Sequence, residues 1–346
     1  MANVIEKSSV TYAHAKLRVD DYWNRGITGK GIKIGIVDDG MGVHEALPVS
    51  GGYACGEHSS YMGESEHATH CAGIALGRNL QNGQPTGIAP EADLYAIRMY
   101  NKTYEDRVRS LIESIDFAID KGIDILSMSI HIAENSINKG DGRESSLGCP
   151  KHLRIKMRNA FYKAFQNDII IVVAAGNHND GSGEDNIEFE ELLPKMPNVV
   201  TVANLAINDK RFKTSGVGRW VDLAGYGYNI RSTILNNRYG HLSGTSMSTP
   251  QIAGIIALYK QFFHEKSAAE VLEELFNNCE QVEGLSSIQQ GRGVPKPPQE
   301  LLDIPEVDNS GSHLRVREYV VWRAIEVSYY NEDGYWKEME AMGIGE

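Results

Sequence analysis

The chain has 346 residues and a formal net charge of −12, which is enough for one large domain or two ordinary ones. The acidic balance argues against nucleic acid or an anionic membrane as a partner, and no apolar run reaches the roughly 18 residues of a membrane span. Four cysteines are too few for a disulfide scaffold, so we expect reduced thiols in a cytoplasmic protein. One or two disulfides, or a secreted mature form, are the alternatives.

Short apolar runs alternate with segments of helical periodicity along the chain. We predict strands at residues 33–37, 94–99, 123–130, 169–175 and 198–203. We predict helices at residues 109–121, 153–165, 246–263 and 268–277. Continuous apolar strands that alternate with helices are typical of a parallel sheet covered on both faces. The sequence therefore predicts an α/β fold of three layers with a central, mostly parallel sheet, and a ligand site beyond the carboxyl ends of its strands.

Three segments supply an acid, an imidazole and a hydroxyl in that chain order. Asp38 ends an apolar strand, His67 opens a helical stretch of small residues, and Ser246 lies in the first turn of a long apolar helix. A serine becomes nucleophilic when a histidine takes its proton and a buried carboxylate orients that histidine. Asp39 competes with Asp38, but neighbours on an extended segment point opposite ways, so only one faces His67. Taken singly, Asp38 also fits a turn residue, His67 a buried histidine and Ser246 a helix cap. The three segments together, in this order, favour a catalytic site.

A fourth component and one alternative concern the same region. Asn177 follows the strand at 169–175, and its side-chain amide can donate to a developing oxyanion, with an ordinary polar turn as the alternative. His67 and His70 could instead hold a metal ion. Zinc sites of the zincin type need histidines four positions apart with an intervening glutamate, which this segment lacks, so we expect no metal there.

These segments resemble those of the subtilisin-like serine peptidases, the subtilases. The resemblance extends from about residue 12 to residue 302 and includes the segments 87–90, 126–129 and 214–218. It implies a serine endopeptidase that acts on proteins or peptides through an acyl-enzyme. A catalytically silent, subtilase-like binding scaffold is the alternative. An esterase of the α/β-hydrolase type does not fit, because the chain order differs and Ser246 has no Gly-x-Ser-x-Gly elbow.

The resemblance also implies a role for each residue of the site. Asp38 orients His67, and His67 acts first as general base and then as general acid. Ser246 attacks the substrate carbonyl, while Asn177 and the Ser246 backbone N–H stabilise the oxyanion. The substrate cleft is then lined by Ser129, Ile130, His131, Ala175 and Gly176.

Several departures from the family pattern bear on specificity. Glycines normally follow the apolar residue of the cleft strand, but here His131 and Ile132 follow it and are expected to narrow the pocket. We therefore expect restricted specificity. The acidic stretch 184–191 leads to the hypothesis that Lys or Arg is preferred before the scissile bond, with a solvated loop as the alternative.

Cys71, four positions after His67, is similar to the cysteine of the thiol-containing subtilases. It is either a small buried hydrophobe or a site at which oxidation or mercurials disable the enzyme. The family's glycine after the catalytic histidine is Ala68 here, and Ser248 and Thr249 precede the motif proline. These changes leave the chemistry intact.

No cofactor is expected for the chemistry, and a structural calcium ion is an open alternative. The loop 76–86 resembles the family's calcium loop in its place, and Asn79 and Asn82 offer oxygens. Calcium needs six to eight oxygen ligands, and Ala46 stands where the family has an aspartate. The sequence therefore does not complete a calcium site.

We divide the chain into a short N-terminal segment (1–11), a peptidase domain (12–303) and a C-terminal extension (304–346). The short first segment is typical either of a processed form or of an intracellular type of subtilase that folds without a long prodomain, and Met1 and the acidic balance favour the second. The extension is rich in aromatic and acidic residues, and we expect it to dock on the domain and to control folding or access. The sequence does not specify an oligomeric state.

Overall fold

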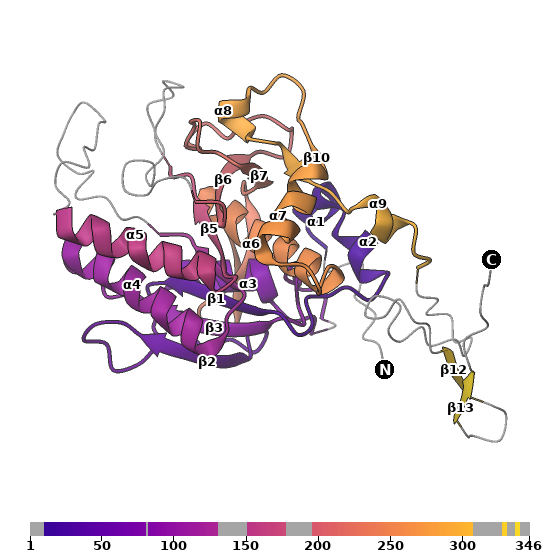
Figure 1. The fold of residues 1–346 in the computed structure, drawn as a ribbon, viewed down its shortest axis with the longest axis horizontal. Helices are drawn as coiled ribbons and strands as arrows, with labels where there is room; N and C mark the ends of the chain where they lie inside the picture. The colour runs from indigo at the N-terminus through magenta and orange to yellow at the C-terminus, as the bar shows by residue number, and fades with distance from the viewer. Residues whose placement is uncertain are drawn as a thin grey trace.

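A computed structural model describes residues 10–80, 82–130, 151–177 and 196–306, together with two strands at 327–330 and 336–339. A seven-stranded sheet forms the centre, in the order β2-β3-β1-β4-β5-β6-β7 (Figure 1). Every neighbouring pair in this sheet is parallel. The expected parallel α/β architecture is therefore confirmed.

Five strands of this sheet coincide with the predicted runs, and its two edge strands, β2 and β7, were not expected. The strands are β1 Lys33–Asp38, β2 Val49–Ala54, β3 Asp93–Arg98, β4 Ile125–Met128, β5 Ile170–Ala174, β6 Val199–Leu205 and β7 Leu223–Tyr226. β2 contains Gly51 and Gly52, and β7 is only four residues long, so neither shows the long β-branched run of a central strand.

The helices include all four that the periodicity predicts. They are α1 Tyr12–Leu17, α2 Val19–Trp23, α3 Glu66–Leu76, α4 Tyr104–Lys121, α5 Lys151–Gln166, α6 Thr245–Phe262, α7 Ala268–Asn277, α8 Ser287–Gln290 and α9 Gln299–Leu302. Three antiparallel strand pairs complete the described elements. They are β8 Ile230–Ile234 with β9 Arg238–Leu242, β10 Cys279–Glu280 with β11 Val294–Pro295, and β12 Val327–Tyr330 with β13 Trp336–Met339.

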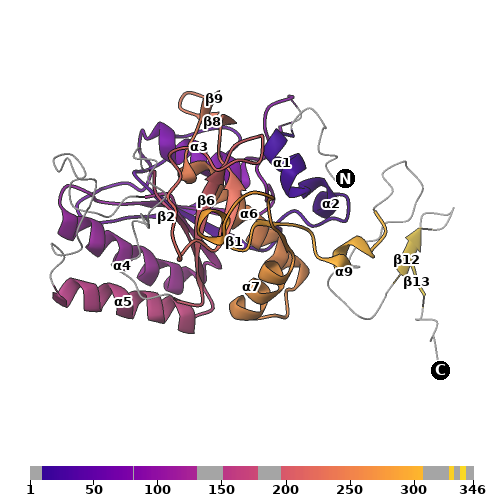
Figure 2. The same cartoon turned by 90° about the horizontal axis from the view of Figure 1, so that it is seen from above.

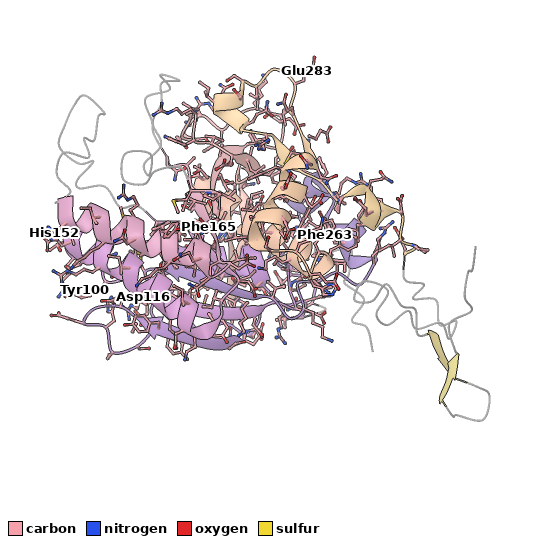
Figure 3. The ribbon with its side chains drawn as sticks, in the orientation of Figure 1. Tyr100, Asp116, His152, Phe165, Phe263 and Glu283 are labelled. Atoms are coloured by element: carbon pink, nitrogen blue, oxygen red, sulfur yellow. The ribbon has the colours of Figure 1, made fainter. Side chains whose placement is uncertain are left out.

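Helices cover both faces of the sheet. Because successive residues of a strand point to opposite faces, each strand contributes side chains to two separate cores. In β5, Ile170 and Val172 join the core beneath α3 and α6, whereas Ile171 and Val173 join the core beneath α4 and α5. Figure 2 shows α4 and α5 side by side, on the other side of the sheet from α3. Asp116 on α4, labelled in Figure 3, has its Oδ1 3.6 Å from Nζ of Lys163 on α5.

The layer of α3 and α6 is packed closely. In α6, each residue from Met247 to Lys260 is buried. A methyl group on Gly73 of α3 would lie 2.1 Å from Thr233 Oγ1 of β8, so only glycine lets the helix approach this hairpin. Thr233 Oγ1 in turn donates to Thr69 O at 2.8 Å. Small residues thus fix where the helix that carries His67 lies.

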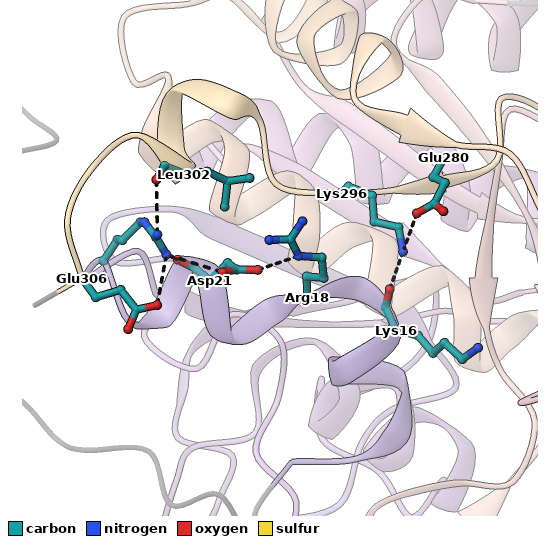
Figure 4. A network of polar contacts seen from close by, with 8 residues as sticks. Lys16, Arg18, Asp21, Glu280, Lys296, Leu302 and Glu306 are labelled. Atoms are coloured by element: carbon teal, nitrogen blue, oxygen red, sulfur yellow. Dashed lines mark hydrogen bonds and ion pairs between the residues drawn. The ribbon is translucent and has the colours of Figure 1, made fainter.

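The two ends of the peptidase domain are joined by polar contacts (Figure 4). Arg25 donates through Nε to Ile304 O at 2.8 Å, and its Nη1 lies 3.7 Å from Glu306 Oε1. Lys296 Nζ donates to Lys16 O at 2.7 Å. Residues up to 306 therefore pack against the segment 16–25. The boundary at 303 and the docking of the extension remain predictions, and most of the extension lies outside the described residues.

None of the described helices combines the length and the apolar character that crossing a bilayer requires.

Candidate active site

Three neighbouring strands deliver polar residues to one edge of the sheet. Asp38 is the last residue of β1, Ser129 directly follows β4, and Asn177 lies three residues beyond the end of β5. The carboxyl ends of parallel strands share one edge, where the crossover connections leave room for ligands. The sequence-predicted residues Asp38 and Asn177 therefore lie at the edge where we expected them.

Asp38 is held on both of its carboxylate oxygens. Oδ1 accepts from the backbone N–H of Asp39 at 2.8 Å, and Oδ2 lies 2.8 Å from His67 Nδ1. The Asp38 side chain is 5% exposed, so the contact to His67 is screened little by water. Asp39 is exposed and accepts from Asn101 Nδ2 at 2.5 Å. Of the two adjacent carboxylates, only Asp38 contacts the imidazole.

His67 lies in the first turn of α3, where local hydrogen bonds fix the backbone. The helix begins after Ser65, whose side chain accepts from the backbone N–H of Ala68 at 3.1 Å. Because an ionised carboxylate only accepts, the Nδ1 atom of His67 carries the proton toward Asp38 and Nε2 is an acceptor. Burial alone would lower the pKa of His67, but the hydrogen bond and charge of Asp38, with the charge of Asp39, raise it.

Ser246 lies at the start of α6 and lines the same cavity as His67. The backbone N–H groups in a first helical turn have no intrahelical acceptor and carry the positive end of the helix dipole. Asn177 is placed against this turn, because its Oδ1 accepts from the backbone N–H of Thr245 at 3.0 Å. With the oxygen so engaged, the Nδ2 group of Asn177 is the end of the amide that can donate to a bound ligand.

The cavity has a volume of about 370 Å³ and brings the predicted residues together. It is lined by Asp38, Asp39, His67, Met99, Asn101, Arg107, Ser129, Ile130, Ala174, Gly176, Asn177, Thr245 and Ser246. Ala175 does not line it, because its side chain is fully buried in the core beside α6. His131 and the acidic stretch 184–191 lie outside the described residues.

Met99, Asn101 and Arg107 line the cavity although sequence reasoning did not select them. Arg107 belongs to α4, which begins at Tyr104 and not at 109 as the apolar periodicity indicated. The signal for the earlier start is the capping box of Thr103 and Asp106, in which each side chain accepts from the backbone N–H of the other.

His70, three positions after His67, is fully buried and has another partner. Its Nε2 lies 2.9 Å from Ile230 O and 3.2 Å from Gly240 O, so it connects α3 to the β8–β9 hairpin. Burial lowers the pKa of His70 to about 4, and the ring is neutral near pH 7. His67 and His70 therefore serve different elements and do not form a pair.

Two groups of donor atoms are candidates for metal binding, one at the site itself and one in the loop 76–86. Among the described residues, Asp38, His67 and Cys71 form a group whose ligand atoms lie within 4.8 Å of one another, and these atoms already contact partners of the site. In the loop 76–86, Asn82 Oδ1 accepts from Gln84 N at 3.1 Å, and the sequence of the loop contains no carboxylate. The loop thus offers only neutral oxygens to calcium, which prefers several carboxylate oxygens, and a calcium site here remains a prediction.

Known proteins resemble this chain in sequence. A family model described as "Subtilase family" matches residues 29–293. "Minor extracellular protease Epr" from Bacillus subtilis (strain 168) is 32% identical over 265 residues, which cover 76% of this chain and 37% of that protein. "Subtilisin DY" from Bacillus licheniformis is 29% identical over 269 residues, which cover 77% of this chain and 90% of that protein. The chain thus spans little more than a third of the first relative and most of the second.

Solved structures share the fold. MycP1 with its N-terminal propeptide removed superposes with a TM-score of 0.68 at 23% identity, covering 86% of this chain and 99% of that one. MycP1 from Mycobacterium smegmatis has a TM-score of 0.64 at 20% identity, with 92% and 91% covered. At these identities the likeness concerns the fold alone.

Proposed function

The chain belongs to the subtilase family, and from this membership we propose that it is a serine endopeptidase that hydrolyses peptide bonds through an acyl-enzyme. The observation that carries the proposal is the 2.8 Å contact between Asp38 and His67 in a cavity that Ser246 and Asn177 also line. Proteins or peptides are the substrates that the family implies. The residue roles below are part of the proposal.

Acylation begins at Ser246. His67 Nε2 accepts the proton of the Ser246 hydroxyl while Oγ attacks the substrate carbonyl, and Asp38 stabilises the imidazolium that forms. The carbonyl oxygen becomes an oxyanion, to which Asn177 Nδ2 and the Ser246 backbone N–H donate. Collapse of the tetrahedral intermediate breaks the C–N bond. The leaving amine takes the proton from His67, and the acyl group stays on Ser246.

Deacylation repeats the steps with water. His67 Nε2 accepts a proton from a water molecule, whose oxygen attacks the acyl carbonyl under the same two oxyanion donors. The intermediate collapses with loss of Ser246 Oγ, which recovers its proton from His67. The carboxylic acid product leaves, and the enzyme returns to its starting state.

The walls of the cavity support a selective enzyme over a broadly acting one. Ser129, Ile130 and Gly176 line it beside the catalytic groups, and Asp39 and Arg107 add one carboxylate and one guanidinium. Charged walls discriminate among substrate side chains, because a mismatched charge loses solvation without gaining a partner. Preference for Lys or Arg before the scissile bond remains a prediction, since the acidic stretch 184–191 lies outside the described residues.

A cytoplasmic location and the absence of a cofactor requirement also remain predictions. The relative Epr is named an extracellular protease. Fractionation of the source cells, with immunodetection of the chain in cytoplasm and medium, tests the location.

A fluorophosphonate probe tests the central proposal. It phosphonylates a serine that a neighbouring histidine activates, so we expect rapid labelling of the full chain and none of the Ser246→Ala variant. Peptide-library cleavage by the two proteins then gives the specificity. No labelling of either protein would favour a binding scaffold, and equal labelling of both would show that the probe reacts at another residue. Either result would contradict the proposal.

A further inference from the structure

We infer that Cys71 is a positioning residue for the nucleophile, because its S–H and the hydroxyl of Ser129 together hold the backbone carbonyl of Ser246. The inference rests on the proposed function and assigns Cys71 a task beyond filling space. Cys71 Sγ lies 3.3 Å from Ser246 O, and Ser129 Oγ lies 2.9 Å from the same oxygen.

The Ser246 carbonyl needs outside donors because of the sequence of α6. A carbonyl in an α-helix normally accepts from the N–H four residues later. Four residues after Ser246 stands Pro250, which has no N–H. The oxygen is part-buried where α3, the end of β4 and α6 meet, and a carbonyl shielded from water without a donor is costly. Cys71 and Ser129 replace the missing helical hydrogen bond.

The peptide unit after Ser246 is held at both ends. The N–H of Met247 donates to Gly244 O at 3.0 Å, while the carbonyl on the other side of the bond accepts from Cys71 and Ser129. One residue before Ser246, the N–H of Thr245 donates to Asn177 Oδ1 at 3.0 Å. Because the backbone on both sides is fixed, the Cα–Cβ bond of Ser246 has a defined direction toward the cavity.

Cys71 connects this peptide to the general base. Residues four apart lie on one face of a helix, so Cys71 stands one turn below His67 on α3. The S–H···O contact joins the helix of His67 to the first turn of the helix of Ser246. A shift of either helix would change the separation of Nε2 and Oγ, on which proton transfer depends.

The thiol is suited to donating. Cys71 is fully buried, and desolvation, with a smaller contribution from the charge of Asp38, raises its pKa well above the ordinary value. The sulfur therefore keeps its proton near pH 7. An apolar side chain of similar size would fill the same space without making this contact.

The experiment uses the full chain and five variants. They are Cys71→Ala, Cys71→Ser, Ser129→Ala, the double variant Cys71→Ala/Ser129→Ala, and the control Cys55→Ala. Cys55 is an equally buried thiol that donates to Ser110 O at 3.6 Å beneath α4, away from the site. The measurements are the rate constant of fluorophosphonate labelling, kcat and KM on a peptide substrate, and the urea midpoint of unfolding.

We expect Cys71→Ala to lower kcat and the labelling rate by on the order of ten-fold with KM nearly unchanged, since the contact acts on the alignment of reacting groups. Cys71→Ser keeps a donor and should recover most of the loss. Cys55→Ala should match Cys71→Ala in its urea midpoint and the parent chain in its rates. The double variant should lose more stability than the two single variants summed, because only it leaves the carbonyl without a donor.

Two results overturn the inference. One is a Cys71→Ala protein with the labelling rate of the parent chain. The other is a Cys71→Ser protein as slow as Cys71→Ala. Failure of the proposed function is distinguishable, because then the parent chain itself is not labelled. In that case the urea midpoints decide whether the two donors share the carbonyl, and additive losses would contradict the shared contact.

Discussion

The two helical layers of this protein differ in how they meet the sheet. α4 and α5 are amphipathic covers, with buried Val108, Leu111 and Ile115 on one face of α4 and exposed charges on the other. α3 and α6 are buried nearly all round, and small residues such as Ala72 and Gly73 bring them close to their neighbours. His67 and Ser246 both stand at the starts of these buried helices.

This difference indicates that the layer of α3 and α6 is held more rigidly than the layer of α4 and α5. An amphipathic helix is held by burial of one face, which tolerates small shifts because the other face is in water. A helix packed on all sides has no direction in which to relax. The catalytic groups thus come from the layer in which position is most strongly determined, and the covering layer contributes Arg107 to the cavity wall.

The largest expected effect is on catalysis, and it distinguishes a residue of the buried layer from one of the covering layer. His67→Ala should lower kcat/KM by on the order of 10⁴-fold or more, since His67 is the one imidazole among the described residues that line the cavity. Arg109→Ala on the exposed face of α4 should leave kcat/KM within about two-fold. Steady-state hydrolysis of one peptide by both variants is the measurement. A His67→Ala protein that keeps a tenth of the activity would show that another group is the base.

The next effect concerns packing, and its sign differs between the layers. Replacing a helical glycine by alanine ordinarily stabilises a helix by about 1 kcal/mol. At Gly73 we expect the reverse, a loss of about 1–3 kcal/mol in the free energy of unfolding, because the added methyl group meets Thr233 Oγ1 and Ser232 Oγ. Urea denaturation followed by circular dichroism measures it.

A matched change on the covering layer is Asn159→Ala, at an exposed position of α5. It should stabilise the protein by a few tenths of a kcal/mol, roughly the difference in helix propensity. If Gly73→Ala also stabilised the protein, the close packing of α3 against β8 would not be a constraint.

A smaller effect tests the electrostatics at the edge of the buried layer. Asp39 raises the pKa of His67 through its charge. His67 acts as a base only when neutral, so activity falls as the pH drops through its pKa. Asp39→Asn should lower that pKa and shift the acidic limb of kcat/KM to lower pH by roughly a few tenths of a unit. The pH profile at low ionic strength is the measurement.

Asp116→Asn on α4 serves as the electrostatic control and should leave the acidic limb in place. The Asp39 shift should also shrink in 1 M salt, because exposed charges are screened there. A profile of Asp39→Asn that moves to higher pH would mean that Asp39 affects the site in some way other than by its charge.

The sequence predicts the central strands and the amphipathic helices because their periodicities are local. Gly122, for example, ends α4 in the left-handed conformation, with φ of 58°, where the pattern predicts a stop. The pattern does not predict the β8–β9 hairpin, although Asn236 and Asn237 both have positive φ in its three-residue loop 235–237, a conformation that asparagine tolerates in hairpin loops. The edge strand β7 lacks a local signal, and part of its backbone pairs with a residue distant in sequence: Gln251 of α6 accepts from Tyr226 N and donates to Tyr226 O.

The catalytic candidates were selected because each lies on a distinctive local segment. The contacts that orient them join residues far apart in the chain, such as Thr245 N–H with Asn177 Oδ1 and Cys71 with Ser246 O. No periodicity encodes such a pair. The position of Pro250 does imply that the Ser246 carbonyl lacks its helical donor, but only the packing of α3 and of the end of β4 against α6 shows which side chains replace it.

The smallest expected effect concerns calcium. If the loop after α3 bound this ion, the bound ion would stabilise the folded state next to α3. A ligand that binds only the folded state stabilises it in proportion to the logarithm of its concentration over Kd. Asn79 and Asn82 offer neutral oxygens without a carboxylate, so the affinity should be weak. We therefore expect EDTA to lower the midpoint of thermal unfolding by less than about 2 °C. A larger fall that added Ca²⁺ reverses, and that Asn79→Ala or Asn82→Ala abolishes, would show that backbone carbonyls complete a site at this loop.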